Sequence, residues 1–204
     1  MMAPDAGGSF GGGGSGSPAD VAASRFDDVD KWESSLPEDQ KKAVASWMRN
    51  GYKEMRNSDK TGAADEKLDS FKEAIKTAPL YNQPVHRGIR HKLDAKVGDE
   101  IDLHAISSFS TNPSVAKSFA VEDVDKGGYI PTSTKVTILS ISSHKGAARL
   151  PMKSIGGRYE TEAVMEKGRK FRVVRVEQTE IKRPGSRGKG PKKWKAQILH
   201  LEEV

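Results

Sequence analysis

The pattern of apolar and polar positions changes character at Pro79. Before it, apolar residues recur at helical spacing in two stripes, Val44, Trp47 and Met48, then Leu68, Phe71 and Ile75. Gly62 interrupts the polar stretch between the stripes, and Pro79 ends the second one. Asp30 and Ser35 stand where N-terminal caps of two helices are expected. The sequence therefore predicts a helical N-terminal lobe over residues 26–79.

After Pro79, short runs rich in β-branched residues alternate between apolar and polar positions. They predict strands at 85–89, 100–104, 135–141, 162–165, 171–176 and 196–201. Asn112 and Pro113 precede apolar positions at helical spacing, which predicts a short capped helix between strands. The expected fold class is α+β, with the helical lobe packed on a mixed or antiparallel β-sheet core over 80–204. Residues 26–204 should form a single domain.

The N-terminal residues 1–25 have a different composition. The run GGSFGGGGSGSP at 7–18 cannot bury enough apolar surface to offset the entropy of ordering it, so we expect a disordered tail. The start of the chain has neither the basic nor the apolar region of a signal peptide. No apolar run approaches the roughly 20 residues of a membrane span. These features predict a cytoplasmic protein without a membrane partner.

Composition excludes several kinds of chemistry. The 204 residues include no cysteine, which excludes disulfides, thiol nucleophiles and thiolate-bound metals. The five histidines have no metal-pair spacing on a helix, and neither a phosphate-binding glycine loop nor a Gly-x-Ser-x-Gly elbow occurs. We therefore expect no metal.

The net charge of +6 favours anionic partners in general. Basic residues concentrate between 182 and 195, at Lys182, Arg183, Arg187, Lys189, Lys192, Lys193 and Lys195. The glycine and proline content of this segment predicts a loop between the last two strands. That loop is either a solvated surface or a phosphate-binding contact to nucleic acid.

Arg87 interrupts the apolar run at 85–89 and is followed directly by Gly88. Burying an arginine without an anion is costly, so Arg87 must reach an anionic ligand or the solvent at a sheet edge. Gly88 would let a ligand approach the backbone closely. The residues alone leave both interpretations open.

Ser108 and Ser110 flank Phe109 in a run of hydroxyl residues. On a strand the two serines share one face, where they could orient a polar ligand or a carboxylate. The alternative is capping of the following helix, which accounts for Asn112 well and for Ser108 poorly.

Glu160 and Glu162 stand two residues apart at the start of an apolar strand. On one strand the two carboxylates would lie on the same face, close enough to raise the cost of ionising both. The alternative is a solvated strand end with alternating charge.

In this order and spacing, Arg87-Gly88, Ser108-Phe109-Ser110 and Glu160-Thr161-Glu162 resemble the Arg–Ser–Glu class of mono-ADP-ribosyltransferases. This cholera-toxin-like group includes bacterial exotoxins, vertebrate ectoenzymes and phage enzymes. The resemblance covers residues 79–204, and the helical lobe fits the N-terminal helices of that fold. Phe109 departs from the usual Ser-Thr-Ser.

The resemblance implies that NAD is a co-substrate. Arg87 would anchor NAD through a phosphate, and Gly88 would leave room for backbone contacts to the nicotinamide amide. Ser108 would orient both the nicotinamide ribose and Glu162, the catalytic carboxylate. Ser110 would belong to the same NAD site.

The resemblance also implies a protein acceptor. Glu160 would position or deprotonate an arginine side chain of that protein. Tyr159 would pack on the acceptor, or alternatively in the core. Residues 121–128 occupy the position of a mobile loop over the NAD phosphates.

The sequence thus predicts an NAD-dependent protein-arginine ADP-ribosyltransferase of phage or toxin effector type. Two alternatives remain. One is a catalytically silent structural, virion or nucleic-acid-associated module with the same fold. The other is an NAD glycohydrolase, in which water replaces the acceptor.

Overall fold

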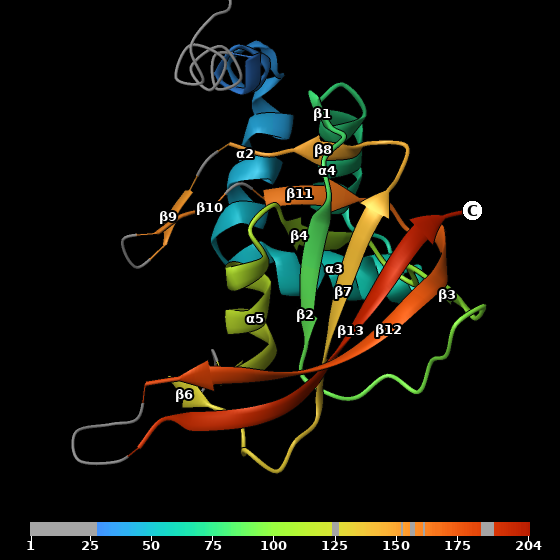
Figure 1. The fold of residues 1–204 in the computed structure, drawn as a ribbon. Coiled ribbons are helices and arrows are strands. Elements are labelled where there is room, and N and C mark those ends of the chain that lie inside the picture. The colour runs from blue at the N-terminus through green and yellow to red at the C-terminus, as the bar shows by residue number, and fades with distance from the viewer. Residues whose placement is uncertain (1–27, 124–126, 152, 156–157, 161, 185–189) are drawn as a thin grey trace, which may run out of the picture.

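Most of the helices come first along the chain and the strands follow, with one further helix between strands (Figure 1). The structure is a computed structural model that describes residues 28–123, 127–151, 153–155, 158–160, 162–184 and 190–204. The predicted α+β class is confirmed. The tail predicted for residues 1–25 lies outside the described residues.

The helical lobe begins with helical residues 28–35. A longer helical segment follows, made of α2 (Glu38–Ser46), the π-helical turn η1 (Trp47–Gly51) and α3 (Tyr52–Thr61). Gly62 ends α3 in the left-handed conformation, with φ of 75°. Asp65 then caps α4 (Glu66–Lys76) by accepting hydrogen bonds from two backbone N–H groups at its start.

The two caps predicted in the first part of this lobe are wrong. Asp30 lies inside the helical residues 28–35, and its carbonyl accepts a hydrogen bond from Ser34 Oγ at 2.7 Å. The Ser35 hydroxyl donates back to the Trp32 carbonyl at 2.8 Å, so it serves the end of that helix. The next helix starts after Pro37 without a side-chain cap.

The main sheet has nine strands in the order β1-β8-β11-β4-β2-β7-β13-β12-β3 (Figure 1). Their bounds are β1 (Leu80–Tyr81), β8 (Ala147–Arg149), β11 (Glu162–Met165), β4 (Ser107–Ser110), β2 (Val85–Ile89), β7 (Val136–Ser143), β13 (Lys192–Glu203), β12 (Lys170–Arg183) and β3 (Glu100–Asp102). Among the strand pairs that the described residues form, only β7 and β13 are parallel, so the sheet is mixed. Two further pairs are β5 (Glu122–Asp123) with β6 (Gly128–Tyr129), and β9 (Lys153–Ile155) with β10 (Arg158–Glu160).

Helix α5 (Pro113–Val121) was predicted from its cap, and the Asn112 side chain does accept a hydrogen bond from Ser114 N at 2.9 Å. The helix packs on β2 at Gly88. A Cβ atom at that position would lie 2.1 Å from the Ala116 carbonyl oxygen and 2.5 Å from Ala120 N. Helix α5 therefore packs directly against the backbone of Gly88 and leaves no room for a side chain there.

The loop predicted over 182–195 is shorter than expected, because residues 182–183 and 192–195 belong to the strands on either side of it. Strands β12 and β13 stay paired as far as Arg183 and Lys192 and form a long hairpin beyond α5 (Figure 1). Ile181 and Trp194 pair across it and are both buried, so one apolar residue on each strand anchors the hairpin. Arg187 and Lys189 lie outside the described residues. On the solvent side are three exposed lysines, called the hairpin lysines below: Lys182, Lys193 and Lys195.

The loop expected over 121–128 contains the short β5–β6 pair, and its residues 124–126 are not among those described. The helical lobe packs on the sheet through a shared core that includes Trp47, Phe71, Ile106 and Val164. Within the described residues, no helix is long and apolar enough to cross a membrane.

Candidate active site

The site is built around Glu162 and Ser108 on neighbouring strands. Strands β11 and β4 are antiparallel, and their register places Glu162 opposite Ser110, one diagonal step from Ser108. The Ser108 hydroxyl donates a hydrogen bond to Glu162 Oε1. Both side chains are half-buried. The contact implied by the resemblance is therefore present, whereas a solvated strand end or a helix cap would not produce it.

Trp47 is a third member of this cluster, and sequence analysis missed it. Its indole Nε1 donates to the same Glu162 Oε1 at 2.9 Å. The indole ring stacks on Phe71 of α4, with centroids 4.5 Å apart and planes 11° from parallel. The sequence shows Trp47 only as a member of an apolar stripe, because its partner is 115 residues away.

Arg87 joins the cluster from the interior of the sheet. Strand β2 lies between β4 and β7, which rules out the sheet-edge interpretation. Arg87 Nη1 donates to the Ser108 carbonyl at 3.0 Å, and the guanidinium lies 5.8 Å from the centre of the Phe109 ring. Arg87 therefore braces the strand that carries Ser108.

The electrostatics around Arg87 favour an anionic ligand. The pKa of Arg87 is lowered to about 10, chiefly by burial and also by the positive charge of Arg56, while the negative charge of Glu162 acts in the opposite direction. The group remains charged at neutral pH, so an incoming anion would relieve the cost of that charge.

Comparison with solved structures identifies the fold. Three bacterial toxins are similar over most of this chain. The Vis toxin, an ADP-ribosyltransferase from Vibrio splendidus, is 22% identical, with a TM-score of 0.61 and coverage of 92% of this chain and 86% of Vis. The C3larvin toxin, an ADP-ribosyltransferase from Paenibacillus larvae, is 13% identical, with a TM-score of 0.54 and coverage of 87% and 93%. The ADP-ribosylating toxin BECa of C. perfringens, solved with NADH, is 15% identical, with a TM-score of 0.53 and coverage of 90% and 48%. The chain has the ADP-ribosyltransferase fold.

Vis has also been solved with agmatine, and that structure is 22% identical, with a TM-score of 0.62. No protein-family model matches the sequence, and a search of curated proteins finds no match. The likeness to the toxins is therefore one of structure, recovered at low sequence identity.

Within this ADP-ribosyltransferase fold, Ser110 has a local structural contact. Its side chain is buried, and its Oγ accepts a hydrogen bond from Asn112 N at 3.0 Å. Ser110 thus supports the turn between β4 and α5. Its membership of the NAD site, like the backbone contact of Gly88 to nicotinamide, stays a prediction.

The side chains of Tyr159 and Glu160 lie outside the described part of the structure. Their backbone forms β10, which pairs with β9 through Tyr159↔Ser154 and Glu160↔Lys153. A shared face for Glu160 and Glu162 would need one continuous strand. Instead, β10 ends at Glu160 and β11 starts at Glu162 in a different sheet, with residue 161 not described. The predicted roles of Tyr159 and Glu160 stay predictions.

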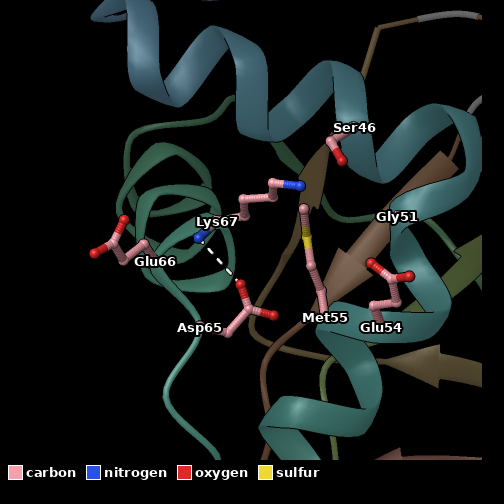
Figure 2. A pocket seen from close by; sticks show the side chains of 7 residues that line it. All are labelled: Ser46, Gly51, Glu54, Met55, Asp65, Glu66 and Lys67. Atoms are coloured by element: carbon pink, nitrogen blue, oxygen red, sulfur yellow. Dashed lines mark hydrogen bonds between the residues drawn. The ribbon is translucent and has the colours of Figure 1, made fainter.

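A separate cavity of 270 Å³ lies between the π-helical turn and the start of α4 (Figure 2). It is lined by Ser46, Gly51, Glu54, Met55, Asp65, Glu66 and Lys67. None of the three clustered residues from the predicted motifs, Arg87, Ser108 and Glu162, lines it. Among the described residues, no group of three His, Asp or Glu side chains is arranged to hold a metal ion.

Proposed function

We propose that this chain is an NAD-dependent mono-ADP-ribosyltransferase that transfers ADP-ribose to an arginine side chain of a protein. The observation that carries the proposal is the hydrogen bond from Ser108 to Glu162 within the ADP-ribosyltransferase fold. Arg87 supports it by bonding to the carbonyl of the same serine.

The geometry suits cleavage of the bond between nicotinamide and ribose. The bonding electrons leave with nicotinamide, whose ring nitrogen becomes neutral, so no general acid is required. Positive charge develops on the ribose, and the fixed carboxylate of Glu162 would stabilise it. Arg87 would hold the NAD phosphate, and the solved structure of the similar toxin BECa contains NADH.

The arginine acceptor is supported by two observations. First, Glu160 follows the sequence pattern that the resemblance associates with arginine acceptors. Second, the similar toxin Vis has been solved with agmatine, which carries the same guanidinium group as arginine. A guanidinium is a poor nucleophile until a base takes or shares its proton, and Glu160 would be that base. The proton then passes to the Glu160 carboxylate as the new bond to ribose forms.

The test uses NAD and agmatine with the purified protein, and mass spectrometry of the products. We expect free nicotinamide and ADP-ribosyl-agmatine in equal amounts. Glu160→Gln should abolish transfer to agmatine while NAD hydrolysis continues, because Glu162 is intact. Glu166→Gln is the matched control, since Glu166 is an exposed carboxylate directly after strand β11, which Glu162 begins.

The products also separate the alternatives. Free ADP-ribose without any agmatine adduct would identify an NAD glycohydrolase. No nicotinamide release at all would identify a catalytically silent module. Equal loss of hydrolysis and transfer in Glu160→Gln would contradict the separate roles of the two glutamates.

A further inference from the structure

The π-helical turn between α2 and α3 sets the direction of Trp47. Such turns are rare, and they occur often at functional sites. Each α-helical residue advances about 100°, so Met55, eight residues after Trp47, would point about 80° away from it in a regular helix. A π turn takes up one extra residue, which brings the two within about 20°. Trp47 and Met55 are indeed both buried in the core between the lobe and the sheet.

Gly51 makes this turn sterically possible. A Cβ atom there would lie 2.4 Å from Ser46 Oγ and 3.0 Å from the Ser46 carbonyl oxygen. The hydroxyl can rotate away, but the carbonyl is part of the backbone and cannot. Figure 2 shows Ser46 and Gly51 at the edge of the cavity beside this turn.

The π-helical turn places the indole N–H of Trp47 within hydrogen-bond distance of Oε1 of Glu162. Both Trp47 Nε1 and the Ser108 hydroxyl bond to Oε1 of Glu162. An indole N–H can only donate, so Oε1 is fixed as the acceptor. Among the described residues, no hydrogen bond is made to Oε2. Two donors on one oxygen fix the rotation of the carboxylate and leave the other oxygen available.

We propose that Trp47 is a positioning residue for Glu162. It holds Oε1 from the helical lobe, while Ser108 holds it from the sheet, so that Oε2 is presented to the ribose of NAD. The stack on Phe71 keeps the indole in place. This inference rests on the proposed function, because it assigns Glu162 the task of stabilising the ribose cation.

The chain offers a matched control for the indole hydrogen bond. Trp32 is also buried in the helical lobe, and its Nε1 donates to Thr77 Oγ1 at 3.1 Å. Trp47→Phe and Trp32→Phe each remove one indole N–H donor and keep an aromatic ring. Only the first change touches Glu162.

The kinetic test measures nicotinamide release from NAD by the two variants. Trp47→Phe should lower kcat on the order of ten- to a hundredfold with KM for NAD nearly unchanged, because the carboxylate is freed without loss of NAD contacts. Trp32→Phe should keep both parameters. Wild-type kcat in Trp47→Phe, or an equal loss in Trp32→Phe, overturns the proposal.

A second measurement decides the placement without any activity. In ¹⁵N-labelled protein, the indole N–H resonance that disappears in Trp47→Phe belongs to Trp47. Glu162→Gln should shift that resonance and leave the Trp32 resonance in place. An unmoved Trp47 resonance overturns the proposal. If the wild-type protein releases no nicotinamide while the resonance does shift, it is the proposed function that fails.

Discussion

Replacing Asp59 by asparagine should weaken the attachment of the helical lobe to the sheet. Asp59 lies in α3 with its side chain 2% exposed. Its Oδ2 accepts a hydrogen bond from Ile106 N at 2.6 Å, and its Oδ1 pairs with Lys72 Nζ at 2.5 Å. Ile106 directly precedes β4, the strand that carries Ser108. The carboxylate therefore ties α3 and α4 to the strand beneath the site.

Asparagine has only one acceptor oxygen for these two donors. If that oxygen keeps the bond to Ile106 N, the new amide N–H₂ group faces the ammonium of Lys72. A lost bond to a charged group costs about 1.5–3 kcal/mol. Lys72 is one-third exposed and can turn to solvent, so we expect about 2–3 kcal/mol, below the 3–5 kcal/mol typical of breaking a fully buried pair.

The assay is urea denaturation of Asp59→Asn with Glu73→Gln as the control. Glu73 pairs with Lys76 on the surface of α4, where both side chains are more than half exposed. Loss of that surface pair should leave the urea midpoint close to that of the wild type, because solvent screens an exposed ion pair. Equal midpoints for the two variants, with unchanged slopes, would refute the bracing role of Asp59.

Three other predictions concern the fold and the partner. Burial raises the pKa of Glu203, but hydrogen bonds from Arg169 and from Lys145 N outweigh that effect and lower the pKa overall. The ionised carboxylate therefore stabilises the folded protein above pH 4.5, and this contribution is lost as the pH falls below that value. Glu203→Gln should therefore cost about 2–3 kcal/mol near neutral pH and little in acid, as urea denaturation at both pH values would show. Gly88→Ala should cost at least about 1–3 kcal/mol and weaken NAD binding by calorimetry, whereas Gly190→Ala, where no atom lies within 4 Å, should do neither. If the hairpin lysines contact nucleic acid, changing all three to glutamine should reduce the salt slope of binding by roughly three units in a fluorescence titration, and an unchanged slope would contradict that contact.

The sequence predicted strands most accurately where turn residues bound a short apolar run. Strands β2 and β11 match their predicted limits at 85–89 and 162–165, and both carry residues of the site. The strand ends at 177–183 and 192–195 were missed because Ile181 and Trp194 are the only apolar residues in those two stretches. Backbone pairing between β12 and β13 defines that part of the hairpin, and the alternation of apolar and polar residues does not.

In the candidate site, residues in short motifs were predicted from the sequence, whereas a residue placed by a long-range contact was not. Arg87, Ser108 and Glu162 stand in short motifs, so residue order alone singled them out. Trp47 reaches Glu162 through a π-helical turn and a contact across 115 residues, and no sequence motif marks that contact. The eight-residue spacing from Trp47 to Met55 was the one available signal, because it is out of phase for a regular helix.

The most direct test of the central claim is nicotinamide release from NAD by Glu162→Gln. The amide keeps the shape of the side chain and removes the charge that would stabilise the ribose cation. We expect a loss on the order of 10²–10³ in kcat, with NAD affinity and Tm close to wild type, and no loss in Glu166→Gln. Near-full turnover by pure Glu162→Gln would contradict the assignment of Glu162 as the catalytic carboxylate.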